Sequence, residues 1–343
     1  MTSLDSPTQP MPGPTPASNA ARRGAVRKWA VVVLGGVVLV GLLLRAALPW
    51  MVERRTVSER RAAGLELRRV QVGDHSIAYL EGGSGEPVVL LHGFGADKDN
   101  WTRTARHLTG SYRVIAPDLP GFGESTYVDG ASYRLEEQAR RLERMVEVLG
   151  LGRFHLAGNS MGGQIAGHYA VAHPERVLSL GLVDCTGVRS PVLSDMEQRI
   201  RRGERPPLVV GSAEEFDRRM SFLFVQAPEI PALIKHVLVE RTRAAAGRHE
   251  AILGQINPEM DALERDLPRI TARTLVLWGD RDRMRDVSSV EVLRRGIPTA
   301  TVVIMRDCGH VPMSERPAES AEHYRQFLAS VVGADERQNP AGK

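Results

Sequence analysis

A ten-residue segment, LAGNSMGGQI at Leu156–Ile165, constrains the fold of this chain more than any other feature. It contains a G-x-S-x-G pattern between a short apolar run, Phe154–Ala157, and a helix-compatible run, Met161–Ala172. This arrangement predicts a strand that turns at once into a helix, with a strained central residue between two glycines that permit close approach. The hydroxyl of Ser160 would project at a helix N-terminus, where free backbone N–H groups favour negative charge. The segment therefore predicts that Ser160 is a catalytic nucleophile.

A serine hydroxyl needs a base to take its proton and an acid to orient that base, and two later segments supply them. The buried-strand pattern TLVLW at Thr274–Trp278 precedes a loop that carries Asp282, and TVVIM at Thr301–Met305 precedes a loop that carries His310. Parallel strands bring their carboxyl ends to one edge of a sheet, and the order Ser, Asp, His matches that of enzymes with a G-x-S-x-G turn. We therefore predict that Asp282 orients His310 and that His310 activates Ser160.

Two further carboxylates are alternatives to Asp282 as the acid. Asp280 lies nearer the end of the same strand, where its side chain is expected to bond to the backbone of the turn. Asp184 follows another strand, in the segment LVDC, and is expected to cap a loop. Asp282 is preferred because it lies farther out on its loop, where its carboxylate is free to accept a hydrogen bond from an imidazole N–H.

Attack on a carbonyl carbon creates an oxyanion, which backbone N–H groups stabilise. The turn after Ser160 would supply the N–H of Met161, and the HGFG loop at residues 92–95, which follows a buried-strand pattern, would supply the N–H of Phe94. His92 is expected to stabilise this loop rather than to act as a second base. The predicted oxyanion hole therefore consists of the N–H groups of Phe94 and Met161.

These motifs are similar to those of the α/β-hydrolases, and within that superfamily the chain resembles the membrane-anchored monoacylglycerol lipases and related bacterial lipases. The resemblance spans about Val70 to Val332 and is weaker between Gly187 and Leu267. It implies a mostly parallel eight-stranded sheet with helices on both faces and a helical cap, the triad and oxyanion hole given above, and no cofactor or metal. The matching stretches are LLHGFGADKDNW (90–101), VIAPDLPGFGES (114–125), GNSMGGQIAGHYA (158–170), LWGDRDRMRDVS (277–288) and CGHVPMSERP (308–317).

Two other functions remain open. The GNSMGG turn also resembles that of meta-cleavage hydrolases, which would use the same triad on a C–C bond of a dienoic keto acid. A membrane-tethered binding protein on a degenerate hydrolase fold is the non-catalytic alternative, and the complete triad argues against it. Haloalkane dehalogenases and epoxide hydrolases are disfavoured because their nucleophile is an aspartate.

A long apolar run near the N-terminus predicts a membrane anchor over residues 29–51. Residues 29–44 form sixteen consecutive positions without a charge, and with Arg45 snorkelling the run reaches the roughly 20 residues that span a bilayer. Tryptophans near both ends fit the interfacial belt. A buried helix is disfavoured by the basic residues at 22–28, and a cleaved signal peptide by the lack of a clear A-x-A site. Because both flanks are basic, the side of the membrane that holds the enzyme is left open.

The formal net charge of +4 does not indicate nucleic-acid binding. Between residues 20 and 70 there are 11 Lys and Arg against 3 Asp and Glu, so the rest of the chain is net acidic. The basic residues would lie near anionic lipid head groups. An anchored enzyme meets substrates that partition into the bilayer, and we therefore expect a lipid ester, or another small ester, as the substrate.

The 343 residues, 42% of them hydrophobic, suffice for one core with an insertion. The insertion contains apolar residues of which Met220, Phe222 and Phe224 are predicted to line an acyl pocket. A disulfide between Cys185 and Cys308 is possible, but no pattern supports it, and the oligomeric state is left open. The predicted divisions are a disordered tail (1–28), the anchor (29–51), a juxtamembrane linker (52–67), the hydrolase core (68–186 and 268–332), the helical cap (187–267) and a C-terminal tail (333–343).

Overall fold

The computed structural model describes residues 16–338, except for the side chains of a number of residues in 16–44 and in 332–338. The chain divides into two units, before and after the boundary between Val52 and Glu53. The first helix, α1 (Pro16–Ala62), runs through this boundary.

The N-terminal helix differs from the predicted divisions at both of its ends. Residues 16–28, predicted to belong to a disordered tail, are helical because the Ala- and Arg-rich stretch after Pro16 favours a helix. Residues 1–15 of that tail lie outside the described part. In the segment 52–67, which was predicted to be a juxtamembrane linker, α1 continues to Ala62 and the first strand starts at Leu65.

The predicted membrane anchor is not supported by the described residues. Among them, no helix has both the length and the apolar character that crossing a bilayer requires. Many side chains of the run 29–51 lie outside the described residues.

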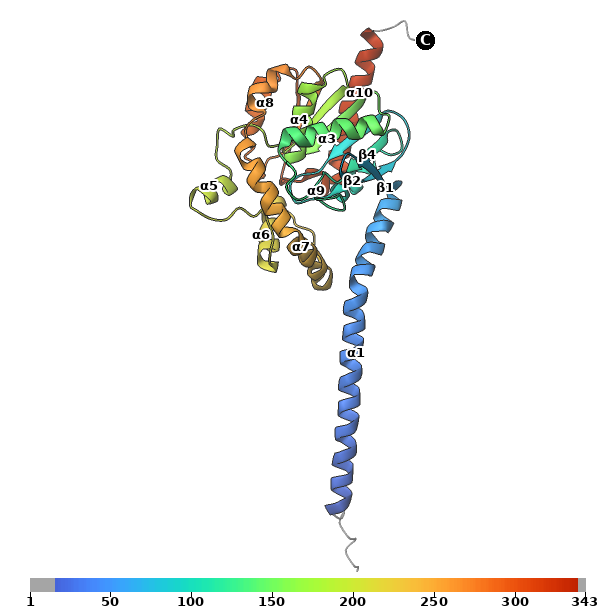
Figure 1. The fold of residues 1–343 in the computed structure, drawn as a ribbon. Coiled ribbons are helices and arrows are strands. Elements are labelled where there is room, and N and C mark those ends of the chain that lie inside the picture. The colour runs from blue at the N-terminus through green and yellow to red at the C-terminus, as the bar shows by residue number, and fades with distance from the viewer. Residues whose placement is uncertain (1–15, 339–343) are drawn as a thin grey trace, which may run out of the picture. The chain divides into compact units, whose positions relative to one another are not determined.

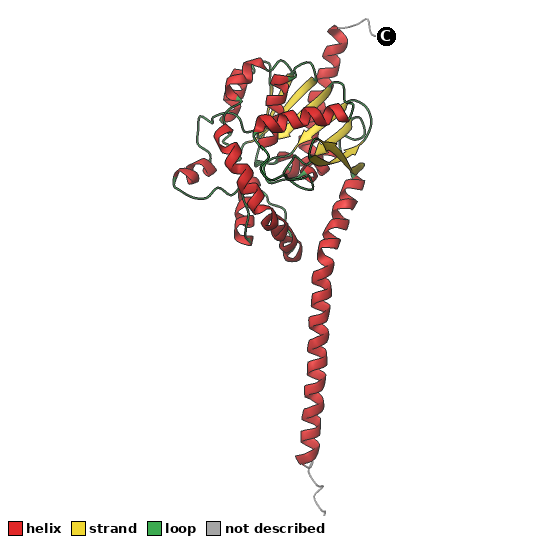
Figure 2. Ribbon diagram, in the orientation of Figure 1, coloured by secondary structure: helices red, strands yellow, loops and turns green. Residues whose placement is uncertain are grey.

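The catalytic unit is built on an eight-stranded sheet, mostly parallel as predicted (Figure 2). The strand order is β1-β2-β4-β3-β5-β6-β7-β8, in which only the pairs β1/β2 and β2/β4 are antiparallel. The strands are β1 (Leu65–Val72), β2 (His75–Gly82), β3 (Pro87–Leu91), β4 (Arg113–Pro117), β5 (Phe154–Asn159), β6 (Val177–Val183), β7 (Arg273–Gly279) and β8 (Thr301–Met305).

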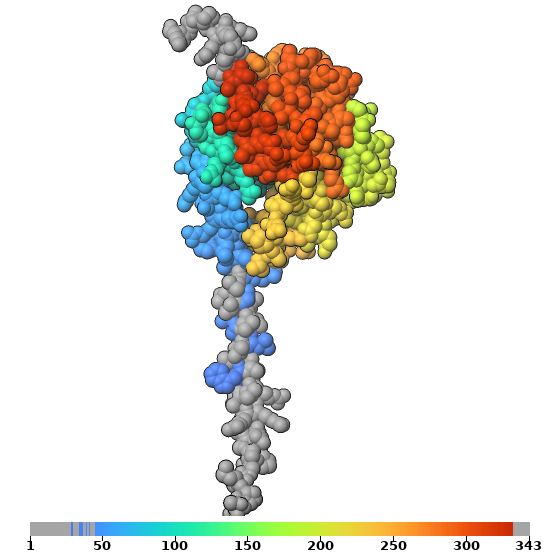
Figure 3. Space-filling view, turned by 180° about the vertical axis from the view of Figure 1, so that it is seen from behind, coloured from blue at the N-terminus to red at the C-terminus, as the bar shows by residue number. Residues whose placement is uncertain are grey.

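The two faces of the sheet are covered by different helices because alternate strand residues point to opposite faces. In β3, Val89 and Leu91 belong to one core cluster, and Val88 and Leu90 belong to the other. The first cluster includes residues of α3 (Leu135–Val148), α4 (Met161–Ala172) and α8 (Ser289–Gly296). The second includes residues of α2 (Thr102–Ala105), α9 (Pro312–Glu315) and α10 (Pro317–Gln338). Seen from behind, the C-terminal part of the chain, orange to red, forms much of the surface (Figure 3). Because α10 reaches Gln338, the predicted tail at 333–343 is helical in its first part.

Parallel strands end together at the edge of the sheet that carries the site. The register pairs Leu91 with Gly158, Asn159 with Val183, and Gly279 with Met305. The loops that follow β3, β5, β6, β7 and β8 therefore start side by side.

The cap lies between β6 and β7 and is helical (Figure 1). Two of its helices begin at side-chain caps: Ser194 and Glu197 form a capping box, and the Ser212 side chain accepts a hydrogen bond from the N–H of Glu215. The elements are α5 (Asp195–Arg201), α6 (Ala213–Leu223), α7 (Ala232–Ile256) and the 3₁₀ helices η2 (Asn257–Glu259) and η3 (Glu264–Arg269).

Candidate active site

Ser160 lies at a strained turn between β5 and α4. Its backbone has φ 55° and ψ −121°, a conformation that costs a non-glycine residue free energy, and its N–H donates to Val183 O at 2.9 Å. The flanking glycines have no room for a side chain, because a Cβ on Gly158 would lie 2.2 Å from Gly162 O and a Cβ on Gly162 would lie 2.5 Å from His92 O. The predicted sharp turn from strand to helix is therefore present.

His310 and Asp282 are hydrogen-bonded to each other. His310 Nδ1 lies 2.7 Å from Asp282 Oδ2, and both side chains are buried. The other carboxylate oxygen, Oδ1, accepts hydrogen bonds from the N–H groups of Met284 at 2.7 Å and Arg285 at 3.0 Å. Because the carboxylate accepts from Nδ1–H, Nε2 of the neutral imidazole is left as a proton acceptor.

The third predicted member of the triad faces the same space. Ser160 and His310 both line two small cavities, each of about 30 Å³. The structure contains no hydrogen bond between these two described side chains, as is common in unliganded hydrolases, whose catalytic contacts tighten when substrate binds. The structure thus brings the three sequence-predicted residues to one edge of the sheet.

The backbone of the predicted oxyanion hole is available for binding. Within the described part of the chain, the N–H groups of Phe94 and Met161 donate no hydrogen bond, and Met161 is the first residue of α4. The HGFG loop is held by His92, whose Nε2 accepts from Leu119 N–H at 2.9 Å and whose Nδ1 lies 2.8 Å from Gly93 O. Burial lowers the pKa of His92 to about 4, so the ring is neutral. The prediction that His92 stabilises the loop is confirmed.

Asp184 lies closer to the triad than the sequence indicated. It follows β6, is fully buried, and its Oδ1 accepts from Gly279 N–H at 2.9 Å, so the loop-capping prediction is confirmed. A ligand atom of Asp184, of Asp282 and of His310 all lie within 4.8 Å of one another. Burial and the negative charge of Asp282 raise the pKa of Asp184 well above its ordinary value, which favours the neutral acid. Three such groups could hold a metal ion, but the facing atoms of Asp282 and His310 are already hydrogen-bonded.

One cavity beside Ser160 has a mostly apolar wall. Leu253, Ile256 and Met260 contribute to it from α7 and the segment after it, and Met196 contributes from α5. The other lining residues are Phe94, Ser160, Met161, Thr186, Leu208, Met284, Arg285 and His310.

The three predicted substrate-binding residues are not among those that line either cavity beside Ser160, so their part in an acyl pocket stays a prediction. Met220 packs inside the cap against a cluster that includes Phe216. Phe222 is buried, with the Arg283 guanidinium 4.5 Å from its ring centre, and Phe224 lines a separate open groove of about 840 Å³. Their apolar character correctly indicated that they belong to the cap. Helical periodicity alone, however, does not say which face of α6 is turned toward the nucleophile.

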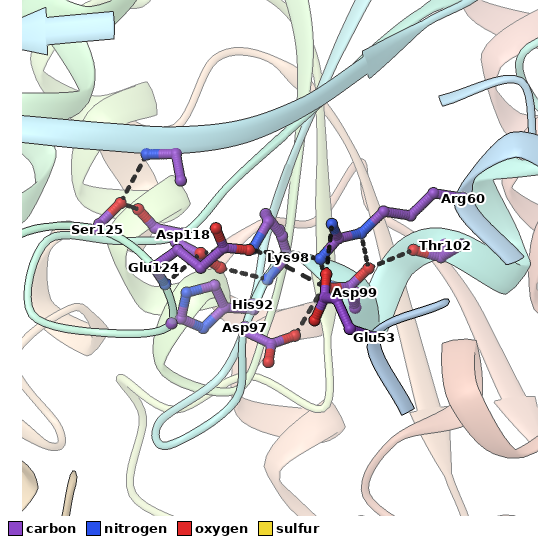
Figure 4. Close-up of polar contacts among 12 residues, drawn as sticks. Glu53, Arg60, His92, Asp97, Lys98, Asp99, Thr102, Asp118, Glu124 and Ser125 are labelled. Atoms are coloured by element: carbon purple, nitrogen blue, oxygen red, sulfur yellow. Dashed lines mark hydrogen bonds and ion pairs between the residues drawn. The ribbon is translucent and has the colours of Figure 1, made fainter. Parts of the chain in front are cut away.

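A network of buried and half-buried charges lies beside the oxyanion loop (Figure 4). Lys98 Nζ lies 2.8 Å from Asp118 Oδ2 and 2.9 Å from Glu124 Oε1, and Arg60 binds both carboxylate oxygens of Asp99. Asp118 also accepts hydrogen bonds from the N–H groups of Lys98 and Glu124, both at 2.7 Å. The loop Asp118–Ser125 is therefore fixed to the segment that follows the HGFG loop.

We expect Lys98→Met to reduce the free energy of unfolding by about 3–5 kcal/mol, because it leaves the buried Asp118 carboxylate without its cation. Arg103→Met is a matched control, since Arg103 is exposed and its ion pair with Glu59 spans 3.9 Å. It should change stability by less than about 1 kcal/mol. Denaturant unfolding of both variants checks this, and equal stability of the two would contradict the role given to Lys98.

Cys185 and Cys308 are both free and buried. The possible disulfide between them is absent.

The fold and the site can now be compared with known proteins. The model of a family described as alpha/beta hydrolase fold matches residues 86–317. The chain belongs to this alpha/beta hydrolase family. The predictions of the superfamily, of its eight-stranded sheet and of the carboxylic ester hydrolase class are therefore confirmed.

Several relatives of this α/β-hydrolase carry names that state an activity. Lipase 1 of Psychrobacter immobilis is 38% identical over 275 residues, which cover 78% of this chain and 86% of the lipase. Human monoacylglycerol lipase ABHD6 is 30% identical over 289 residues, covering 80% and 86%. A crystal structure described as a membrane phospholipase A, a bacterial virulence factor, matches with a TM-score of 0.82 at 49% identity, covering 89% of this chain and 99% of that one.

Proposed function

We propose that this α/β-hydrolase is a membrane-associated serine hydrolase that cleaves carboxylic esters of lipids, acylglycerols or related glycerolipids. The observation that carries the proposal is the strained Ser160 turn facing a cavity that it shares with the hydrogen-bonded pair His310 and Asp282. A serine, an imidazole and a carboxylate in these roles form the machinery of acyl transfer.

In the proposed mechanism, Ser160 Oγ attacks the ester carbonyl while His310 Nε2 takes the hydroxyl proton. The negative charge moves to the carbonyl oxygen, where the N–H groups of Phe94 and Met161 stabilise it. Asp282 holds the imidazolium in place through Nδ1. His310 then donates its proton to the leaving alcohol, an acyl-enzyme forms on Ser160, and a water molecule activated by the same imidazole releases the acid.

The lining of the cavity favours an acyl chain as the group beside the nucleophile. Met, Leu and Ile side chains dominate one of its walls, and burying them against methylene groups stabilises binding by about 0.8 kcal/mol per CH₂. The volume of about 30 Å³ is too small for a long chain, so the cap helices must move to admit one. The relatives named lipase, monoacylglycerol lipase and membrane phospholipase A support the same substrate class.

The proposal includes membrane association mainly because of features of the sequence. The uncharged run 29–44 and its basic flanks are the supporting features, together with the membrane phospholipase A at 49% identity. An anchor would hold the active site beside substrates that are dissolved in the bilayer.

An ester panel tests the substrate class. Full-length protein in vesicles and in detergent micelles is assayed on esters from acetyl to long-chain monoacylglycerols. We expect kcat/KM to rise with acyl length by about tenfold or more from acetate to medium chains, because each buried CH₂ adds stabilisation. A preference for short water-soluble esters in both preparations would remove the lipid assignment. Turnover of a chromogenic dienoic keto acid in place of esters would establish the C–C hydrolase alternative.

A further inference from the structure

The second cavity beside Ser160 differs in character from the apolar one. It shares Phe94, Ser160, Leu208, Met284 and His310 with the first cavity. Its other lining residues are mostly polar or small, and they include one arginine of the cap: Gly93, Ala96, Asn100, Asn159, Arg219, Leu223 and Val311. Most of its wall is still apolar, but it is the more polar of the two cavities, and we call it the polar cavity.

The arginine of the polar cavity, Arg219 on α6, lacks an acidic partner. Its Nη2 donates to the backbone carbonyl oxygen of Phe94 at 3.0 Å, and among the described residues no carboxylate oxygen lies within 4.0 Å of its guanidinium. Arg285, which lines the apolar cavity, is by contrast paired with Glu197 at 2.8 Å and Asp261 at 3.3 Å. Arg219 is thus a cation in the site that forms no direct ion pair with a described carboxylate.

Burial makes this arrangement costly for the free protein. It lowers the pKa of Arg219 to about 10, and the charge of Asp97 opposes that shift. The guanidinium nevertheless stays protonated at neutral pH, with a neutral carbonyl as its acceptor. Arg219 is half-buried, and a charge partly withdrawn from water without an ion-pair partner is destabilising. An anionic ligand would reduce that penalty through charge-assisted hydrogen bonds.

The guanidinium also lies at a suitable distance from the nucleophile. A Cβ on Gly93 would lie 3.1 Å from Ser160 Cβ, and a Cβ on Gly95 would lie 2.8 Å from Arg219 Nη1. Because these two glycines are separated by one residue, their Cα atoms are at most about 7 Å apart. An anionic group bound to Arg219 and an ester carbonyl at Ser160 could therefore belong to one molecule in which a short linker joins them.

We propose that Arg219 binds the phosphate group of a glycerophospholipid substrate in the polar cavity while the acyl chain occupies the apolar one. In such a lipid the phosphate is joined to the ester through the short glycerol backbone, and Arg219 and Ser160 line the same small cavity. The inference rests on the proposed function and narrows its substrate from acylglycerols in general to phosphate-bearing glycerolipids. Arg219 is then a residue that determines specificity.

A pair of substrates that differ only in the phosphate tests this role. Full-length wild type, Arg219→Gln and Arg219→Lys are assayed in detergent micelles on a 1-monoacylglycerol and on the 1-acylglycerol 3-phosphate with the same chain. We expect Arg219→Gln to lower kcat/KM for the phosphate ester by on the order of tenfold to a hundredfold and for the neutral ester by less than about threefold. Arg219→Lys should recover part of the loss. Arg218→Gln, which removes an exposed charge from the adjacent position, should leave both substrates unaffected.

Inhibition by the free head group gives a second readout. Glycerol 3-phosphate should competitively inhibit monoacylglycerol hydrolysis by wild type and by Arg218→Gln, and not by Arg219→Gln. Equal losses on both substrates would overturn the inference and show that Arg219 only holds the Phe94 loop. If Arg219→Gln does not fold, the Arg219→Lys ratio and inhibition of the wild type decide the question. Hydrolysis of neither ester by the wild type would instead refute the proposed function itself.

Discussion

Ser160→Ala is expected to lower kcat for ester hydrolysis by on the order of 10⁴-fold to 10⁶-fold, because it removes the atom that forms the acyl-enzyme. The strained turn exposes this hydroxyl in the cavity that His310 also lines, and substitution by alanine leaves the backbone hydrogen bond to Val183 O in place. The variant should therefore fold normally. Initial rates on a monoacylglycerol and intact-mass detection of a fluorophosphonate adduct measure the effect.

The matched control is Ser84→Ala, in an exposed loop between β2 and β3. Wild type and Ser84→Ala should take up one equivalent of the fluorophosphonate and Ser160→Ala none. Labelling of Ser160→Ala at an undiminished rate would disprove the nucleophile assignment. Absence of labelling in the wild type would instead favour a binding protein on this fold.

The second large effect is expected at the acid. Asp282→Asn should lower kcat by about 10⁴-fold, because an amide cannot accept from Nδ1–H in the same way and His310 then adopts the wrong tautomer. Asp184→Asn should lower kcat by less than about tenfold. The environment of Asp184 already favours the neutral acid, and the Asn oxygen can still accept from Gly279 N–H.

Parallel kinetics on the two variants compare these carboxylates directly. A larger loss for Asp184→Asn than for Asp282→Asn would assign the acid to β6 instead of β7. Stability gives an independent check, because an acid whose pKa is raised in the folded state binds more protons there than in the unfolded state. The contribution of Asp184 to the free energy of unfolding should therefore fall as the pH rises above about 4, and Asp184→Asn should remove this contribution, measured as the difference from wild type at each pH.

Much of the fold could be predicted from local pattern. The apolar run Thr301–Met305 located β8 at its observed bounds, and the runs Phe154–Ala157 and Thr274–Trp278 located β5 and β7 to within two residues. The turn at Ser160 was predictable because a strand that enters a helix through one residue leaves few allowed backbone conformations. The N-terminal helix was harder to predict. The low charge and many small polar residues of this segment indicated disorder, but a helix begins at Pro16.

The cap shows where pattern is insufficient. Met220 and Phe222 belong to α6, and Phe224 follows the last residue of this helix in an extended conformation. All three are apolar as expected, yet they pack within the cap or face an open groove. Arg219 directly precedes Met220, and nothing in the sequence distinguishes it from a surface arginine. In the structure it lines a cavity at Ser160. Spacing along α6 describes the faces of the helix but not the orientation of each face toward the core.

The amino-acid sequence by itself determined the strand-to-helix turn, the identity and chain order of Ser160, Asp282 and His310, and the superfamily, because these depend on backbone sterics and on motifs of a few residues. Only the tertiary structure decided that Asp184 lies beside the His310–Asp282 pair and that Arg219 has no acidic partner. These facts are distances between groups remote in the chain. Such distances arise from the packing of the cap and the sheet, which no local pattern encodes.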